Sequence, residues 1–256
     1  MTAKKSSVDK SATRVQSMFG EIAPKYDLLN NLLSFGLAKQ WRRRYVREVF
    51  QRLAERSNPT KKLETLDLAT GTGDVIAEQL RQWTRRKLAD KLGVKEFQPV
   101  GVDFVPEMLA LARKKVPAVE FVEADAHNLP FDDERFDAVT NSFGLRNMVE
   151  PKKAIAEMAR VCRKGGVVAI LEFSPTKFPL FAPIFRFYFH AILPLIGNFV
   201  SGNKSDAYRY LPESVDAFDS PETTLQYMRD AGLDAPTRLP MTFGTLGLFV
   251  GRKTKT

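Results

Sequence analysis

Three aspartates have the spacing of acids that follow successive strands of a sheet. Asp67 lies in LDLATGTGD, Asp103 ends VGVD, and Asp125 lies in EADAHNLPF. A carboxylate at the second position can accept two hydrogen bonds from ribose hydroxyls, and one at the third can accept from an adenine amino group. Each acid alone is more often a strand-end or helix-capping residue. Together, at the carboxyl ends of neighbouring strands, they indicate a nucleoside site in the crevice of an open sheet.

The turn that follows Asp67 is rich in glycine. Gly71 and Gly73 let a ligand approach the backbone closely. The dinucleotide fingerprint needs a third glycine three residues further on, where this chain has Ile76, so the turn fits a pyrophosphate poorly. Asp67 is then free to face a cationic group. An adenosyl ligand without phosphates, but with a cationic amino-acid tail, is S-adenosylmethionine (AdoMet), which is the predicted cofactor.

A sheet of parallel strands is needed to bring these residues together. The sequence predicts strands and helices in alternation, which favours a parallel α/β sheet with right-handed crossovers. The last two predicted strands have no helix between them, so we expect an antiparallel hairpin at one edge. The expected strands are Leu63–Leu68, Pro99–Val102, Val119–Glu123, Phe136–Asn141, Gly165–Phe173, Ala235–Met241 and Thr245–Gly251, with helices from Val75, over Pro106–Lys115 and Pro151–Cys162, and near Pro221–Ala231.

The net charge of +9 comes from the N-terminal quarter of the 256-residue chain. Residues 1–62 contain 14 Lys and Arg against 5 Asp and Glu, whereas the rest of the chain is balanced. The ordinary explanation for this charge is a helix face exposed to solvent. The more specific explanations are binding to an anionic membrane surface and binding to an RNA backbone. Cys162 is the only cysteine, so no internal disulfide is possible. With two histidines besides, the sequence offers no metal-ligand cluster and we expect no metal.

The segment Phe178–Val200 is strongly apolar, and Arg186 is its only fully charged side chain. Its length would suffice for a membrane span, but Pro179, Pro183 and Pro194 each break or kink a helix. It falls between the fifth predicted strand and the late helix, where an insertion can cover the substrate side of the sheet. We expect kinked pieces of helix that form a cap. Packing at a dimer interface is the second interpretation, and a plain core segment is the third.

Motifs along most of the chain occur together in one known family. The combination of KYDLLNNLLSFG, FGLRN and YRYLPES is specific, and LDLATGTGD, VDFVPEML and AILEFSP accompany it. From about Met18 to Arg252 the chain resembles the quinone-ring C-methyltransferases of menaquinone and ubiquinone biosynthesis, the bacterial UbiE/MenG type and its mitochondrial relatives. The resemblance implies the class I AdoMet-dependent methyltransferase fold. This is a Rossmann-like, seven-stranded, mostly parallel sheet with an antiparallel C-terminal hairpin, N-terminal helices and, here, an apolar cap insertion.

The resemblance also implies which residues bind the cofactor and shows where this chain departs from its family. The AdoMet contacts carry over to Thr72, Asp103, Asp125, Ala126 and Ser142. The family usually has histidine where Ala38 stands, and it usually ends in ALHRG after a Gly-Gly turn, whereas this chain ends in TFGTLGLFVGRK. These departures concern the detail of substrate binding more than cofactor binding.

Methyl transfer to a ring carbon requires an electron-rich ring, so the implied substrate is a reduced polyprenyl quinol and not a quinone. Arg146 in FGLRN, just past the fourth predicted strand, is the candidate that stabilises the phenolate oxygen, and Asn147 is expected to share this role. From the residues alone, a pairing of Arg146 with an acid in a loop is an equal alternative. His127 is a weaker candidate for the base that takes the ring proton. His190, in the apolar segment, is expected to pack.

The cap is expected to serve the polyprenyl tail, which is long and wholly apolar. Phe181 and Phe185 are predicted to contact this substrate, and Tyr208 and Arg209 to line the ring pocket, although a structural tyrosine corner is an equal interpretation. Basic N-terminal helices against anionic lipid predict a cytoplasmic enzyme, attached peripherally to the inner face of the membrane. A homodimer is a further expectation, and no nucleic acid partner is expected.

The predicted organisation is one large domain with an N-terminal appendage. We expect a disordered basic arm over residues 1–13, a helical lid over 14–62 that includes a helix from Lys39 to Arg56, and the AdoMet-binding domain over 63–256, with the cap near 175–215. Two other functions stay open: methylation of another lipophilic phenol or sterol, and RNA binding or modification by the basic N terminus. The absence of an Asn-Pro-Pro-Tyr motif and of a catalytic cysteine disfavours RNA modification.

Overall fold

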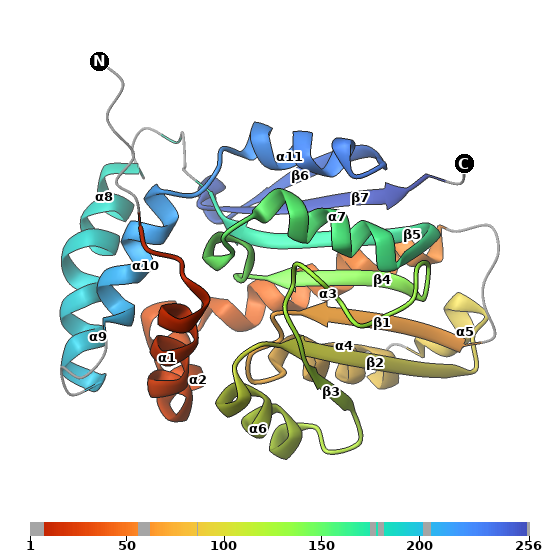
Figure 1. The fold of residues 1–256 in the computed structure, drawn as a ribbon, viewed down its shortest axis with the longest axis horizontal. Coiled ribbons are helices and arrows are strands. Elements are labelled where there is room, and N and C mark those ends of the chain that lie inside the picture. Colours follow the sequence, from red (N-terminus) through yellow and green to blue (C-terminus); the bar gives the residue numbers. More distant parts are fainter. Residues whose placement is uncertain are drawn as a thin grey trace.

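A seven-stranded sheet crosses the molecule, with helices on both of its faces (Figure 1). The computed structural model describes residues 8–55, 62–85, 87–174, 178, 182–201 and 206–254, and over 198–201 it describes the backbone alone. The strand order is β3-β2-β1-β4-β5-β7-β6, and β7 runs in the direction opposite to the other six strands. The strands are β1 (Lys62–Leu68), β2 (Glu96–Asp103), β3 (Glu120–Glu123), β4 (Phe136–Ser142), β5 (Cys162–Phe173), β6 (Leu233–Met241) and β7 (Leu246–Lys253).

The predicted fold class is confirmed, with one difference in the placing of the last strands. β6 and β7 form the expected antiparallel hairpin, but β7 inserts between β5 and β6, so the antiparallel strand lies inside the sheet. β5 begins three residues before its predicted start, because Gly165 and Gly166 lie within the strand and do not form a turn ahead of it. The register of β5 against β4 shifts between Phe136 and Ala138. This irregularity in the pairing lets the residues around the two glycines remain part of the strand.

Alternate residues of β5 supply two separate layers of core. Val167 and Leu171 pack with α3, α4 and α5, whereas Val168 and Ile170 pack with α7 and α11 on the opposite face. Because helices cover both faces of this central strand, its sequence is a nearly continuous run of apolar residues.

The helices are α1 (Ala12–Ile22), α2 (Tyr26–Leu33), α3 (Leu37–Ala54), α4 (Asp74–Arg85), α5 (Leu88–Leu92), α6 (Pro106–Lys115), α7 (Pro151–Val161), α8 (Ala182–Phe187), α9 (Leu193–Ser201), α10 (Ala207–Asp216) and α11 (Pro221–Asp230). Short 3-10 turns are η1 (Ala23–Lys25), η2 (Leu145–Asn147) and η4 (Thr242–Gly244), and η3 (Tyr188–Ile192) is π-helical.

The N-terminal helices and the segment after β5 gather at one end of the sheet, beside the carboxyl ends of the parallel strands (Figure 1). There α10 packs Tyr208 and Tyr210 against Val15 and Met18 of α1 in one buried cluster. The third helix differs, because Tyr45 of α3 is buried against the sheet and its hydroxyl donates to backbone carbonyls of β4 and β5. The predicted lid over 14–62 thus consists of α1 and α2 above the strand ends and α3 within the core. Of the predicted arm, residues 1–7 lie outside the described residues.

The apolar segment forms a kinked helix. α8, η3 and α9 follow one another without a break, and the π-helical turn directly precedes Pro194, which has no backbone N–H to complete an ordinary helical bond. Ile184, Phe187 and Leu195 are 66%, 66% and 71% exposed, whereas Phe189 is buried. Within the described ranges, we find no helix that is both long and apolar enough to cross a membrane.

Candidate active site

Asp103 ends β2 and is buried at the carboxyl edge of the sheet. Its Oδ2 accepts a hydrogen bond from the Gly71 backbone N–H at 2.8 Å, and its Oδ1 accepts one from Val105 at 3.0 Å. Burial raises the pKa of Asp103 to about 6, although these backbone hydrogen bonds act in the opposite direction. A carboxylate has about four acceptor sites, so Asp103 is held in one orientation and still has capacity for a ligand.

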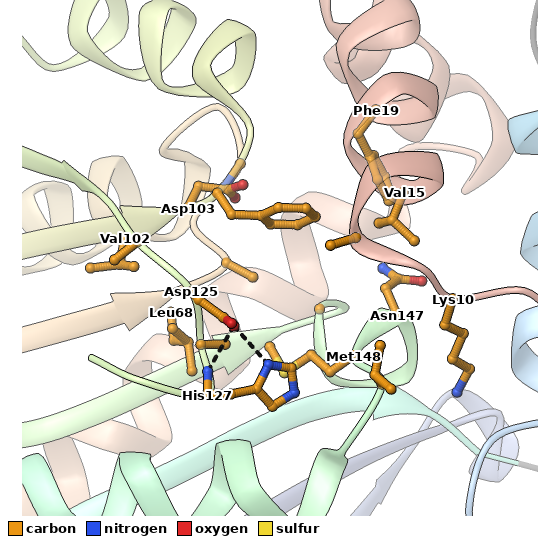
Figure 2. Close-up of a pocket in the computed structure, with 18 of the residues that line it drawn as sticks. Lys10, Val15, Phe19, Leu68, Val102, Asp103, Asp125, His127, Asn147 and Met148 are labelled. Carbon is orange, nitrogen blue, oxygen red and sulfur yellow. Dashed lines mark hydrogen bonds and ion pairs between the residues drawn. The ribbon is translucent and has the colours of Figure 1, made fainter. Parts of the chain in front are cut away.

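Asp125 and His127 form a pair on the loop after β3 (Figure 2). The Asp125 Oδ1 accepts from the His127 backbone N–H at 2.9 Å and lies 2.7 Å from His127 Nδ1. The His127 Nε2 accepts from the backbone N–H of Glu150 at 3.3 Å, which leaves the ring proton on Nδ1. Partial burial acts against ionisation, but the hydrogen bonds from His127 prevail and lower the pKa of Asp125. Both ring nitrogens have partners, so His127 orients Asp125 and is poorly placed to act as a base.

A cavity of about 340 Å³ lies between these acids and α1. Figure 2 shows Asp103 on one side, the Asp125–His127 pair on another, and Val15 and Phe19 of α1 opposite. Its size falls in the range of small-molecule pockets, about 300 to 1,000 Å³. We call it the acidic cavity. The predicted site residues that line it are Gly71, Asp103, Asp125, Ala126, Ser142 and Asn147.

A second cavity of about 160 Å³ adjoins the first, and many aromatic rings line one side of it. These rings come from the β4–η2 connection, β5 and the kinked helix, as Phe143, Phe173, Phe185, Tyr188 and Phe189. The glycine turn contributes polar groups to the other side. We call it the aromatic cavity. The predicted site residues that line it are Asp67, Thr72, Ser142, Arg146 and Phe185.

The two cavities share a wall formed by Ala69, Ser142 and Phe143. Ala69 has a φ of 53° and Phe143 a φ of 59°, in the left-handed region that residues other than glycine rarely adopt. A Cβ on Gly144 would lie 2.6 Å from the Cβ of Ala69, so only glycine fits there. Such strain persists where the surrounding structure imposes it, most often at functional sites. The partition between the cavities is therefore one residue layer with a constrained backbone.

Asp67 is buried on the aromatic side of the glycine turn. Its Oδ1 accepts from Thr140 Oγ1 and its Oδ2 from Thr70 Oγ1, each at 2.7 Å. Burial raises the pKa of Asp67 to about 7, and the two hydroxyl hydrogen bonds act in the opposite direction. The carboxyl group consequently changes charge near neutral pH, and a cation placed beside it favours the ionised form.

Arg146 is buried beside the aromatic cavity and paired with Glu172 of β5. Its Nη1 donates to Glu172 Oε1 at 2.9 Å and to the Phe143 carbonyl at 2.5 Å, and its backbone N–H donates to Glu172 Oε2 at 3.2 Å. The guanidinium lies 5.3 Å from the ring centroid of Phe173. Its Nε has no acceptor among the described residues. The site thus holds a rigid cation with one open donor against a wall of rings.

Thr72 belongs to an ionic cluster that connects the glycine turn to α2, α3 and α6. Its Oγ1 donates to Asp27 of α2 at 2.6 Å, and Lys115 of α6 lies 2.6 Å from both Asp27 and Asp74. Arg42 of α3 adds an ion pair to Asp74 at 2.5 Å. The helices that close the site are therefore fastened to the turn that the sequence assigns to the cofactor.

Residues 7–253 match the UbiE/COQ5 methyltransferase family. The chain belongs to this family. It is 45% identical over 242 residues to the demethylmenaquinone methyltransferase of Thermus thermophilus, covering 91% of this chain and 99% of that protein. It is 38% identical over 252 residues to the ubiquinone/menaquinone biosynthesis C-methyltransferase UbiE of a Geobacter species, covering 96% and 99%. A putative methyltransferase of Haloferax volcanii, solved with the Trm112 methyltransferase activator, shares the fold with a TM-score of 0.57 at 19% identity, over 92% and 97% of the two chains.

Membership of the UbiE/COQ5 family confirms the predicted enzyme class, a C-methyltransferase of quinone biosynthesis that uses AdoMet. The site fits that cofactor by its own chemistry. Asp103 and Asp125 present oriented carboxylate oxygens to one cavity. Asn147 lines the same cavity, and its buried Oδ1 has no partner in the part of the chain that the structure describes. Acceptors of this kind suit the hydroxyl and amino groups of an adenosyl ligand.

Four predicted site residues of this UbiE/COQ5 family member lie away from both cavities or outside the described residues. Gly73 has a φ of +78°, and a Cβ there would lie 3.2 Å from a methyl group of α6, so it serves the packing of the turn. Tyr208 is buried between α10 and the N-terminal helices, and Arg209 is largely exposed, with an ion pair at 2.9 Å to Asp206. Phe181 lies outside the described residues. Substrate roles for Tyr208, Arg209 and Phe181 stay predictions.

Sequence reasoning missed three polar residues that hold the predicted ones in place. Glu172 pairs with Arg146, Thr140 bonds Asp67, and Asp27 bonds Thr72. Glu172 had a visible signal, because it is the one acid in the strand GGVVAILEF. An acid in an otherwise apolar buried strand needs a cationic partner. The alternative in which Arg146 pairs with an acid is thus observed, with the acid on a central strand and not in a loop.

Proposed function

We propose that this enzyme transfers the methyl group of AdoMet to a ring carbon of a polyprenyl quinol, with demethylmenaquinol as its substrate. Two cavities of different chemistry that meet at one wall support this proposal. One offers carboxylates to a polar cofactor and the other offers aromatic walls to a ring. The relative named for demethylmenaquinone alone is 45% identical, whereas the relative named for both quinones is 38% identical, which favours a naphthoquinol ring.

The acidic cavity is the proposed place of the adenosyl group. Asp103 is positioned to accept from ribose hydroxyls, and Asp125 from the adenine amino group, while Ala126 and Ser142 flank them. Asp67 and Thr72, on the aromatic side of the turn, are positioned for the charged amino-acid tail. When bound, AdoMet supplies an electrophilic methyl group, so the protein has to orient the acceptor ring and exclude water.

The observation that carries the proposal is Arg146, which lines the aromatic cavity and has a buried Nε without an acceptor among the described residues. A donor held there by Glu172 lowers the free energy of a quinol oxygen as it gains phenolate character, and burial strengthens this interaction. The ring carbon ortho to that oxygen becomes nucleophilic and forms the new carbon–carbon bond as the sulfur–methyl bond breaks. Loss of the ring proton then restores the aromatic quinol. Asn147 directly follows Arg146 in η2 and lines the acidic cavity, whereas Arg146 lines the aromatic one.

The polyprenyl tail is proposed to leave the aromatic cavity along α2 and the kinked helix. The Tyr188 hydroxyl donates to the Leu33 carbonyl at 2.7 Å, and its ring lies 5.3 Å from that of Phe35, so α2 and η3 form one surface. Exposed apolar patches of this kind mark interaction sites. We propose contact with a bilayer, which makes the enzyme peripheral at the cytoplasmic face, with self-association as the competing use. The exposed side chains are Leu28, Leu32, Phe35, Ile184, Phe187 and Leu195.

Purified protein, AdoMet and two reduced substrates test the proposal. The substrates are a demethylmenaquinol and the benzoquinol precursor of ubiquinone, each with and without a polyprenyl tail, and the product is S-adenosylhomocysteine together with the methylated ring. We expect turnover of the naphthoquinol and a lower KM with the tail than without it. Methylation of a sterol or another phenol in preference to both quinols would overturn the substrate assignment. Sedimentation of the unliganded protein distinguishes a dimer from a monomer that binds vesicles.

A further inference from the structure

Arginine side chains gather in a hollow between α3 and α4, separate from both cavities. The hollow has a volume of about 420 Å³, and no acidic residue is among those that line it. None of its lining residues lines the acidic or the aromatic cavity. We call it the arginine hollow. Its lining residues are Gln40, Arg43, Arg44, Arg47, Arg81, Gln82 and Arg85.

The positive charge of the arginine hollow is largely uncompensated. Only Arg81 is paired, with Glu78 one turn earlier on α4, and the other four arginines form no ion pair with any residue that the structure describes. Two acids on the same helices form ion pairs with other arginines: Asp74 pairs with Arg42, and Glu48 pairs with Arg52. Three of the four unpaired arginines, Arg43, Arg44 and Arg47, belong to the basic first 62 residues.

The fold holds these charges together on two packed helices. Gln82 of α4 donates from Nε2 to the Arg43 carbonyl of α3 at 2.9 Å, and its other Nε2 contact is Glu78 at 2.7 Å. Arg43 and Arg47 stand one turn apart on α3, as do Arg81 and Arg85 on α4, and like charges at this spacing repel. Glu78 offsets part of the charge of Arg81, but no acid lines the hollow to offset the charges of the other four arginines. A bound anion would do so.

We propose that the arginine hollow is a binding site for phosphate-bearing anions. The planar guanidinium fork matches the geometry of phosphate oxygens, and several forks converge here on a space large enough for a phosphate and its substituents. The source that we favour is the headgroup of an anionic lipid, because α3 follows α2 directly in the chain and α2 carries exposed apolar side chains. A soluble phosphate compound has the same chemistry. The site stands on its own observations and does not require the methyl-transfer assignment.

The full-length protein with two charges removed tests the site. The variant is Arg43→Gln with Arg47→Gln, and the matched control is Lys95→Gln with Lys164→Gln, two exposed lysines at the amino ends of β2 and β5. Binding is measured by sedimentation with vesicles of phosphatidylglycerol in phosphatidylcholine, and with phosphatidylcholine alone. We expect the wild type and the control to prefer the anionic vesicles. The hollow variant should lose at least about tenfold of that preference, in a salt-dependent way.

Inorganic pyrophosphate separates the two sources of phosphate. It should raise the melting temperature of the wild type and the control and leave that of the hollow variant unchanged. If the hollow variant loses both the preference for anionic vesicles and the stabilisation by pyrophosphate, the favoured source of phosphate is a lipid headgroup. If it loses only the stabilisation by pyrophosphate, the source is a soluble compound. A hollow variant that behaves like the control in both arms overturns the proposal, as does tighter, hollow-dependent binding of a transfer RNA. Turnover of a tail-less quinol, expected to be equal in all three proteins, reports separately on the proposed function.

Discussion

The two cavities of this enzyme are built from different parts of the fold. The acidic cavity takes its key carboxylates from the sheet edge, where backbone N–H groups orient Asp103 and the neighbouring loop orients Asp125. The aromatic cavity takes its rings from the kinked helix, from α2 and α3, from the loop after β4 and from the end of β5. Sheet geometry thus determines much of the acidic cavity, whereas the aromatic cavity depends largely on helices packed at the end of the sheet. Changes on the two sides should accordingly affect different measurements.

Arg146→Lys should produce the largest separation between the two sides. Lysine keeps the charge opposite Glu172 but loses the planar fork and the open Nε donor. We expect kcat to fall about 10²- to 10³-fold, the scale of losing one donor to a developing oxyanion, with AdoMet affinity unchanged. Steady-state kinetics and calorimetry measure the two quantities. Equal losses in both, or in neither, would remove Arg146 from the chemistry.

Asp103→Ala should act on the opposite side. Loss of hydrogen bonds to a charged group weakens binding by about 1–3 kcal/mol, which is roughly a 5- to 150-fold rise in the AdoMet dissociation constant. The KM for the quinol should stay unchanged at saturating AdoMet. Asp234→Ala, an exposed acid on β6, is the control for the loss of one charge. Unchanged AdoMet affinity in the Asp103 variant, measured by calorimetry, would falsify the cofactor assignment.

Phe185→Ser tests the outer part of the aromatic cavity. Partial burial of an aromatic side chain against the tail contributes about 1–2 kcal/mol to the free energy of substrate binding. Without it, the KM for a long-tailed quinol should rise roughly 5- to 30-fold. The KM for a tail-less quinol should not change, because remote apolar contacts contribute uniform binding. Phe187→Ser, on the same helix but exposed, should leave KM in detergent unchanged and weaken vesicle binding. A similar loss on both substrates would assign Phe185 to the fold.

Asp67→Asn should change the pH dependence of stability, apart from any effect on binding of the cofactor's charged tail. The folded pKa of Asp67 is about 7, above the ordinary value near 4, so the folded protein keeps a proton that the unfolded chain releases. Its contribution to stability is full below about pH 4 and is lost as the pH rises to 7. Relative to the variant, the wild type should lose unfolding free energy between pH 5 and pH 8. Denaturant unfolding at the two pH values measures this, and parallel behaviour would contradict it.

The positions of the strand-end acids were largely predictable from the sequence because their signals are local. Each of Asp67, Asp103 and Asp125 closes or follows a strand that can be recognised from its own residues, and parallel strands bring their ends together. The helix Pro106–Lys115 matches its predicted bounds for the same reason: proline begins it, and basic residues occupy its last turn.

The aromatic cavity was less predictable because its contacts join distant segments. Arg146 meets Glu172 across 26 positions, and Tyr188 meets Leu33 across 155. The motif of Tyr208 is compatible with a pocket residue and with a structural tyrosine, and the packing of α10 on α1 that buries its side chain is not visible in the motif. No periodicity within one element encodes which neighbour covers it.

The shared wall of Ala69, Ser142 and Phe143 has a consequence for inhibitor design. Adenosine pockets are common to many enzymes, so a compound that fills the acidic cavity alone would discriminate poorly. A bisubstrate compound, with an adenosyl group joined to a flat apolar ring, would occupy both cavities and convert the second contact into an intramolecular one. Because the partition is one residue layer, a linker of a few atoms suffices. Selectivity over other adenosine-binding enzymes would then depend on how the linker crosses the shared wall beside the strained backbone of Ala69 and Phe143.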